Sequence, residues 1–429
     1  MPPQRARRYA SGQLQRQIVS QLSRQPYTLA ELQAATGASM PTVRRALEDL
    51  IEGAWVVPVG QNMSTGGRRA TRFGLNGESH LIIGAHIAIP DVNCVVRALD
   101  GTLLDQQCLT GANPLLPDDA VAIITAYVEQ VRNRYPERQI LGIGVTTPGY
   151  MDAAREQILY VGRAEGWQNF PLKMRLEEVS GLPVVLENDT DCLLRAELDY
   201  LGQPPARDLI YLAVLDGVKL SMMLDGQIYS GSFGNAGIIG RTRMRSTQPD
   251  DALYNLEDVA SVGALCAAFD RQYRQLNGAG PELEQITAIA EREVKFAAIL
   301  AAAARGEPVT NALVNRFFDD LSLALANIIF VLQPLVLIVG GQLCNMPVEL
   351  RGRFENAVRE HLPPLLRNHL SVRYAALTGR FAPASGAAQW FLKHAIQSGI
   401  AFELPPGQSS GAAENGVRYT PQMSSGFNS

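Results

Sequence analysis

The first fifty residues carry hydrophobic side chains at the spacing of amphipathic helices. One such face carries Leu14, Ile18 and Leu22. A second helix is predicted to begin at Thr28, because Glu31 three residues later completes the side-chain pattern of a capping box. Gly37 is expected to end this helix, since glycine adopts the left-handed conformation of a helix C-terminus most easily.

A third helix is predicted after Ser39, which we expect to cap it. Its core-facing positions follow the spacing i, i+3, i+4, i+7 and i+8, and they are Val43, Ala46, Leu47, Leu50 and Ile51. The outward positions at its start are Thr42, Arg44 and Arg45. Two helices joined by a tight glycine-containing turn, with basic and hydroxyl side chains at the exposed start of the second, are typical of a helix-turn-helix.

Two short strands are predicted after these helices, at residues 55–59 and 70–75. The connection between them contains two glycines and ends in Arg68 and Arg69. This hairpin has the pattern of the wing of a winged helix-turn-helix. We expect Arg68 and Arg69 to contact phosphates or the minor groove, and Thr42, Arg44 and Arg45 to contact phosphates or bases in the major groove.

Net charge distinguishes residues 1–76, which we call the head, from the rest of the chain, which we call the body. Residues 1–76 hold ten arginines, no lysine and four acidic residues, a net charge of +6, so the remainder carries −10 within a total of −4. A basic head on an acidic body favours a polyanionic partner for the head. The alternative is a small protein-docking module whose arginines are merely solvated.

Composition excludes several other classes of protein. Of the 429 residues, 46% are hydrophobic and 19% are charged, which is too apolar for a disordered chain. Five cysteines lie far apart, which argues against a disulfide scaffold and fits a reducing cytoplasm. No signal peptide is apparent. The most membrane-like stretch, residues 321–339, contains Pro334, and we expect a buried helix before it and a strand after it.

Beyond residue 81, apolar runs of strand length alternate with helical stretches, which predicts a mixed α/β fold. The runs span residues 81–87, 92–99, 140–145, 184–186, 209–214 and 335–339. One of them leads into the polar pair Asn188 and Asp189. Ligands of open α/β sheets lie beyond the carboxyl ends of strands, so this pair is a candidate ligand site. The alternative is a strand-end turn whose side chains cap the next helix.

Several segments of the chain, in order, resemble the ROK family, which is named for its repressors, open reading frames and kinases. The resemblance covers nearly the whole chain, and its matching segments are residues 142–149, 166–172, 181–189, 225–231, 256–261, 339–341 and 386–388. It implies a body of two actin-like lobes, with the ribonuclease H-like ATPase fold, around a cleft. Kinase members phosphorylate a hexose with ATP in this cleft, whereas repressor members sense sugars.

The phosphate-binding features of the kinase members are missing. Phosphoryl transfer needs a general base, a glycine-lined cradle and a magnesium site, and only the base is recognisable here. The family's first phosphate loop, Asp-x-Gly-Gly-Thr, corresponds to residues 86–90, which have neither the aspartate nor the glycines. Its second loop corresponds to residues 215–219, where Asp216 should repel a nucleotide unless a metal or Lys219 offsets its charge. We therefore expect no ATP to bind.

Zinc is not expected either, because residues 237–241 contain no histidine and the next cysteine is Cys266. The resemblance implies sugar contacts at Asn188, Asp189 and Glu257, and it places Arg241 where the family has a sugar-contacting histidine. We expect Arg241 to favour an anionic sugar derivative through its guanidinium group. For Glu257 the alternative is an exposed carboxylate at a helix start.

These observations predict a transcriptional regulator, most simply a repressor, in the cytoplasm. Residues 1–76 are expected to form the winged helix-turn-helix, 77–403 the two-lobed body dividing near residue 190, and 404–429 a disordered tail. The expected partners are an operator in double-stranded DNA, a sugar or sugar derivative, and a second copy of the chain. The alternatives are a sugar kinase with a DNA-binding appendage and a body that serves only for dimerisation.

Overall fold

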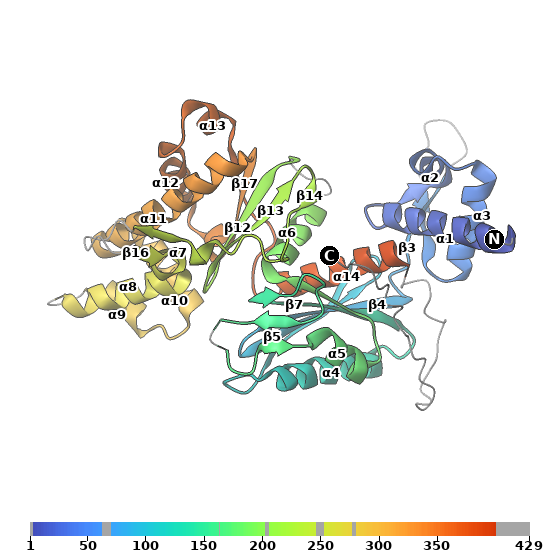
Figure 1. The fold of residues 1–429 in the computed structure, drawn as a ribbon, viewed down its shortest axis with the longest axis horizontal. Coiled ribbons are helices and arrows are strands. Elements are labelled where there is room, and N and C mark those ends of the chain that lie inside the picture. The colour runs from blue at the N-terminus through green and yellow to red at the C-terminus, as the bar shows by residue number, and fades with distance from the viewer. Residues whose placement is uncertain are drawn as a thin grey trace, which may run out of the picture.

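The computed structural model describes residues 3–61, 70–162, 164–201, 206–245, 253–276 and 280–399. Arg68, Arg69 and the expected tail at residues 404–429 lie outside these ranges. A head, a first lobe and a second lobe follow one another along the long axis of the molecule, with the head beside the first lobe (Figure 1). No described helix is both long and apolar enough to cross a membrane.

Three helices and a three-stranded sheet in the order β1-β3-β2 form the head. Its elements are α1 (Pro3–Leu22), β1 (Tyr27–Thr28), α2 (Leu29–Thr36), α3 (Met40–Glu52), β2 (Val56–Gln61) and β3 (Thr71–Leu75). The predicted capping box is confirmed, since the Thr28 hydroxyl accepts from the Glu31 N–H at 3.3 Å while the Glu31 carboxylate accepts from the Thr28 N–H at 2.7 Å. Gly37 ends α2 with a φ of 68°.

Two details of the predicted third helix are wrong. Ser39 precedes α3, but its hydroxyl lies 2.7 Å from the Thr42 hydroxyl and does not cap a backbone N–H. Ile51 is 38% exposed, whereas the other four predicted core positions of α3 are buried. The helical period explains this, because residue 51 lies about 80° from Val43 around the helix axis, at the edge of the apolar stripe.

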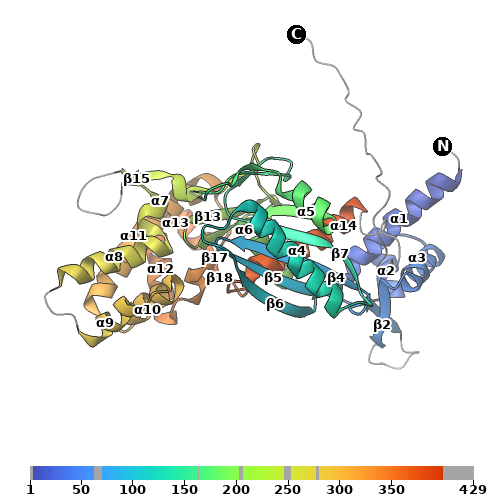
Figure 2. The same ribbon diagram turned by 90° about the horizontal axis from the view of Figure 1, so that it is seen from below.

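The first lobe contains a five-stranded sheet in the order β11-β7-β4-β5-β6. Strand β7 runs parallel to β4 and β11, while β5 is antiparallel to β4 and β6. Helices α4 and α5 cover one face of this sheet, and α14 covers the other (Figure 2). The bounds are β4 (His80–Ala88), β5 (Asp91–Ala98), β6 (Leu103–Thr110), β7 (Gln139–Thr147), β11 (Val184–Asn188), α4 (Pro117–Arg134), α5 (Leu172–Ser180) and α14 (Ala382–Ser398).

The second lobe repeats this strand order with five strands arranged as β14-β13-β12-β17-β18. In both sheets the first three strands in sequence are antiparallel neighbours, and the fourth and fifth continue in parallel on the other side of the first. This repeat confirms the predicted two-lobed actin-like fold. The strands are β12 (Leu209–Val214), β13 (Val218–Leu224), β14 (Gln227–Ile228), β17 (Val336–Gly341) and β18 (Ser371–Tyr374).

Helices surround the second sheet, and α6 (Asp189–Tyr200) lies between the lobes. The others are α7 (Leu256–Ala260), α8 (Val262–Gln275), α9 (Pro281–Ala288), α10 (Arg292–Ala304), α11 (Pro308–Leu332), α12 (Val348–Glu360) and α13 (Pro364–His369). Short elements complete the body, namely β8 (Tyr150–Met151), β9 (Ile158–Tyr160), β10 (Gln168–Phe170), β15 (Arg243–Arg245), β16 (Leu253–Asn255), η1 (Ile239–Arg241) and η2 (Gln342–Asn345). The predicted helix before Pro334 and the strand after it are α11 and β17.

Helix α14 approaches the first sheet backbone to backbone. A Cβ atom at Gly84 would lie 2.0 Å from the Ala384 carbonyl oxygen, and one at Gly144 would lie 1.9 Å from the Ala387 carbonyl oxygen. Only glycine at these two strand positions allows such contact, because any side chain would overlap the helix backbone.

The last turns of α14 pack against the head. Phe391 and Ile396 of α14 share one apolar cluster with Ile18 of α1, Leu50 of α3 and Ile82 of β4. The cluster therefore runs without interruption from the head into the first lobe. Figure 1 shows α14 lying along the first sheet, with one end beside the head.

We expect Phe391→Ala to lower the free energy of unfolding by about 3–5 kcal/mol, the usual cost of removing a buried phenyl ring. Phe391 is 1% exposed, and its ring fills the space where a Cβ atom at Gly142 would lie, 2.2 Å from Phe391 Cζ. Phe233 is 84% exposed, so Phe233→Ala is a matched control with an expected change below about 0.5 kcal/mol. Urea denaturation measures both, and equal effects would contradict the shared core.

Candidate functional site

The exposed face of α3 carries separated charges. Thr42, Arg44 and Arg45 are all exposed in its first half, whereas Glu48 and Asp49 are exposed further along the helix. Positive charge therefore gathers toward the N-terminal half of α3, where the aligned peptide dipoles also favour an anion. In helix-turn-helix proteins, residues at this end of the second helix contact the bases.

The strands β2 and β3 form the antiparallel hairpin that was predicted as a wing. Arg72, on β3, donates to the Pro26 carbonyl and lies 3.7 Å from the Glu31 carboxylate. This arginine fastens β3 to the start of α2. The positions of Arg68 and Arg69 in the intervening loop lie outside the described residues.

In the second lobe, the turn between β12 and β13 carries Asp216. Its carboxylate lies 3.6 Å from Arg292 Nη1, and both side chains are largely exposed. The sequence suggests Lys219 as the residue that offsets this charge, but its ammonium group lies 2.8 Å from both oxygens of Asp189 instead. The reason is that Lys219 lies in β13 facing the first turn of α6, where the carboxylate of Asp189 is buried.

Asp189 is held by a buried ion pair. Both carboxylate oxygens lie 2.8 Å from Lys219 Nζ, and Asp189 is only 3% exposed. One of the oxygens also accepts from the Thr190 N–H at 2.7 Å and the Thr190 hydroxyl at 3.1 Å. Burial alone would raise the pKa of Asp189, but the Lys219 ammonium and these hydrogen bonds outweigh burial and lower it. The carboxylate is therefore charged, and a sugar hydroxyl would have to compete with Lys219 for it.

Asn188 occupies the position that precedes α6. Its side-chain oxygen accepts from the Thr190 N–H at 2.9 Å, so it caps the helix. This is the capping role that the sequence left open as the alternative to ligand contact. Here the capping contact and the neighbouring ion pair together fix the first turn of α6.

Glu257 and Arg241 form a second ion pair nearby. Arg241 Nε lies 3.1 Å from Glu257 Oε1, with side chains 50% and 25% exposed, respectively. Glu257 lies in the first turn of α7, and a Cβ atom at Gly217 would lie 3.3 Å from its other oxygen. Both ion pairs therefore flank the start of β13, and the four candidate pocket residues lie around the same strand.

A buried network of charged residues, which the sequence analysis missed, lies next to Asp189 at the end of β11 and the start of α6. Glu187 lies 3.0 Å from Arg155 Nη2 and 3.2 Å from Arg195 Nη2. Asp191 accepts from the Ser221 hydroxyl at 2.5 Å, and Arg195 stacks 3.6 Å above the Trp390 ring of α14. The available signal was the pair of acids at 187 and 191, which flank the polar pair in an otherwise apolar segment.

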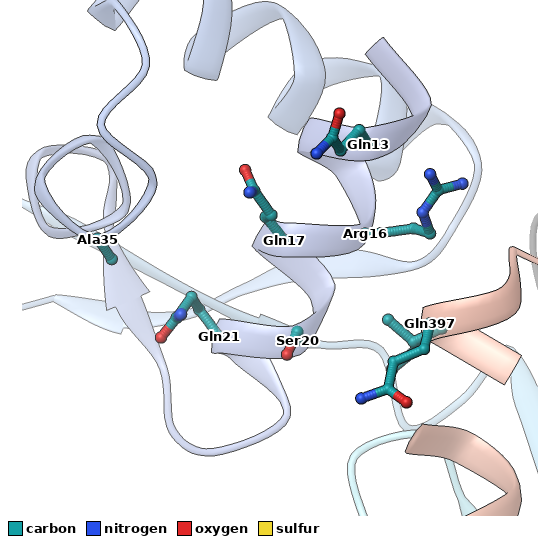
Figure 3. A pocket seen from close by; sticks show the side chains of 8 residues that line it. Gln13, Arg16, Gln17, Ser20, Gln21, Ala35 and Gln397 are labelled. Atoms are coloured by element: carbon teal, nitrogen blue, oxygen red, sulfur yellow. The ribbon is translucent and has the colours of Figure 1, made fainter. Parts of the chain in front are cut away.

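A separate hollow of about 640 Å³ lies where the head meets the body, between α1 and the end of α14 (Figure 3). Its lining consists of Gln13, Arg16, Gln17, Ser20, Gln21, Ala35, Ile396 and Gln397. Amide side chains predominate, and the guanidinium group of Arg16 lies close to Gly399. The head and body thus meet through the apolar cluster on one side and this polar hollow on the other.

Among the described residues, the positions that the family resemblance assigns to zinc ligands and to phosphate binding carry other groups. No group of three or more histidine, cysteine, aspartate or glutamate side chains among the described residues is placed to hold a metal ion. Cys266 is buried, and its thiol donates to the Arg292 carbonyl at 3.5 Å. Arg241 replaces the family histidine and is engaged with Glu257. At the second phosphate turn, Asp216 presents a carboxylate where a kinase needs N–H donors.

The duplicated sheet topology, the helix α6 that begins at Asp189 and the head at the N-terminus define a two-lobed actin-like protein with an added helical head. The chain belongs to the ROK family, whose family model matches residues 82–394.

Its relatives include both repressors and kinases. The chain is 22% identical to a xylose repressor of Bacillus subtilis over 87% of its own length and 93% of the repressor. It is 31% identical to a beta-glucoside kinase of Listeria innocua, but this match covers 48% of the chain and 66% of the kinase. A solved ROK family transcriptional regulator, a homolog of the E. coli MLC protein, superposes with a TM-score of 0.72 at 19% identity, covering 92% of this chain and 97% of the regulator.

We expect Lys219→Met to lower the free energy of unfolding at neutral pH by about 3–5 kcal/mol, because it removes the cation that pairs with the buried Asp189 carboxylate. Adding Asp189→Asn to this variant should restore most of the loss. Arg207 and Asp225 form an exposed ion pair, so Arg207→Met is a matched control with an expected change below about 1 kcal/mol.

In Lys219→Met, the contribution of Asp189 to the free energy of unfolding should change with pH in the opposite direction from that in the wild type. The lowered pKa of Asp189 stabilises the wild-type fold above the unfolded pKa, near 3.9, and this stability is lost as the pH falls through the folded pKa. In Lys219→Met, burial raises the pKa, so the variant should gain stability relative to wild type on acidification. Urea titrations at neutral and acidic pH measure this, and parallel curves would contradict the ion-pair assignment.

Proposed function

We propose that this protein is a DNA-binding transcriptional repressor whose ROK body has no kinase activity. The observation that carries the proposal is the basic, exposed first half of α3 in a head that shares its core with the body. The ROK regulator of known structure and the xylose repressor both match nearly the full length of the chain, which supports the same function.

In the proposed complex, α3 lies in the major groove with Thr42, Arg44 and Arg45 toward the DNA. Arg68 and Arg69 of the wing contact phosphates or the minor groove beside it. Two copies of the chain present two such heads to the half-sites of a palindromic operator, as a symmetric dimer requires. Such a protein works where the DNA is, in the cytoplasm.

The body is proposed to bind a sugar or a sugar derivative through Asn188, Asp189, Glu257 and Arg241. Each of these side chains is already engaged in a cap or an ion pair, so a ligand must exchange hydrogen bonds with Lys219 and with the Arg241–Glu257 pair. An anionic derivative would compete with Glu257 for Arg241. Any rearrangement at the start of α6 is passed to α14 through Arg195 and Trp390, and α14 leads to the head.

Arg44→Ala is expected to change sequence preference and to cost about 1–3 kcal/mol of specific binding free energy, since a base-contacting arginine is lost. Replacing both Arg68 and Arg69 with alanine should instead weaken binding to all sequences and reduce the slope of log K against log salt by about 2. Fluorescence anisotropy at several salt concentrations measures both effects. Arg207→Ala, in the body, is the control that leaves binding unchanged, and an equal loss in all variants would contradict the proposed interface.

We expect no hexose phosphorylation above background in a coupled assay with ATP. Asp189 is occupied by Lys219. The stretches that correspond to the family's two phosphate loops have Ala88 and Ile89 in the first, and Leu215 and Lys219 in the second, in place of glycines. Asp189→Asn should therefore leave the background rate unchanged. Turnover that disappears in Asp189→Asn would overturn this expectation and support a sugar kinase with a DNA-binding head.

A further inference from the structure

A cavity of about 360 Å³ lies between the two lobes, beside His86. Strands β4 and β5 of the first lobe form one wall, and the start of α10 and the turn after β17 form the other. The segment that leads from β18 into α14 closes it with Arg380, Ala382 and Pro383. This volume is within the range of sites for small organic molecules.

Two buried acceptors in this cavity have no hydrogen-bond donor among the described residues. Asn93 is 3% exposed, and its Oδ1 atom has no partner. His86 Nδ1 is likewise buried without a partner, while the ring also forms a hydrogen bond with the backbone of Arg380. Burial lowers the pKa of His86 to about 4, so the ring is neutral and Nδ1 is an acceptor. Buried polar atoms are nearly always paired, so both atoms indicate a ligand that supplies donors.

The charged groups that line the cavity are mostly acidic. Four carboxylates meet two guanidinium groups, and these residues are Asp91, Asp216, Glu291, Glu293, Arg292 and Arg380. Arg292 pairs with Asp216 at 3.6 Å, and Arg380 pairs with Glu291 at 3.5 Å. Among the described residues, Asp91 and Glu293 have no ion-pair partner within 4 Å. The lining therefore carries two negative charges beyond its internal pairs.

We propose that this cavity binds a small hydroxylated amine of the amino-sugar class. Its hydroxyl or amine hydrogens donate to Asn93 Oδ1 and His86 Nδ1, and its ammonium group lies near Asp91. The same surplus of carboxylates disfavours phosphate groups, which need N–H donors and cations. The family resemblance implies that kinase members bind a nucleotide in this cleft. In this chain the lining of the cleft instead favours a cation over a phosphate group.

The position of the cavity connects it to the proposed repressor function. Ala382 and Pro383 line it at the first turn of α14, and Ile396 at the last turn packs in the cluster that contains the head. A ligand that orders the start of α14 therefore acts on the helix that supports the head. Binding itself does not depend on DNA, so it can be tested whether or not the proposed function is correct.

Calorimetry on the full-length protein without DNA tests the proposal. The probes are glucosamine, glucose and glucose 6-phosphate at about pH 6.5, where such an amine is protonated. We expect saturable binding of glucosamine, at least about tenfold weaker binding of glucose because it lacks the charge, and no binding of glucose 6-phosphate in the cavity. Absence of saturable glucosamine binding, or tighter binding of glucose 6-phosphate that persists in Glu257→Gln, would overturn the proposal.

Variants locate the binding. Asp91→Asn and Asn93→Leu should each weaken glucosamine binding at least about tenfold. Asp119→Asn, an exposed aspartate on α4 outside the cavity, is the matched control and should bind as wild type does. Thermal melts establish whether each variant is folded. If Asn93→Leu is not folded, the result for Asp91→Asn alone decides the test. Binding that survives Asp91→Asn but is lost in Glu257→Gln would place glucosamine in the candidate pocket around Asp189 and Glu257, and it would overturn the proposal.

Discussion

Helix α14 can lie against β4 and β7 only because Gly84 and Gly144 have no side chains. That contact brings α14 back across the first lobe, so Gly84 and Ala384, which are 300 positions apart in sequence, pack against each other. Because the same helix also packs on α1, the head is attached by buried apolar surface and not by its linker alone. Among the described residues, this helix and the sheet beneath it connect the inter-lobe region to the head that carries the proposed DNA-binding surface.

The second organising feature is the placement of charge around the start of α6. Asp189, which the family resemblance makes the base of kinases, is saturated by Lys219 and Thr190. Glu187 and Asp191 are compensated by Arg155 and Arg195 beneath it. A carboxylate that is fully paired and buried contributes to rigidity more readily than to proton transfer, which needs a free lone pair. This arrangement is consistent with a body that retains the fold of the kinases without their chemistry.

Local patterns in the sequence predicted much of this structure. The capping box at Thr28, the glycine stop at Gly37, the strand β12 and the division of 321–339 around Pro334 depend on neighbours in sequence, and the structure confirms them. Long-range pairing was not predictable in the same way. The partner of Lys219 is 30 residues away, and the return of α14 to the first sheet follows only from the fold. Within a single helix, periodicity does not decide whether a residue at the edge of the apolar stripe is buried, and Ile51 is an example.

The central claim is that the head recognises a particular DNA sequence. Fluorescence anisotropy at about 0.15 M salt, comparing the region upstream of the protein's own gene with a shuffled duplex of equal length and composition, tests it most directly. The account predicts binding to the upstream region at least about 10³-fold tighter than to the shuffled duplex. Equal affinity for the two duplexes would contradict the account.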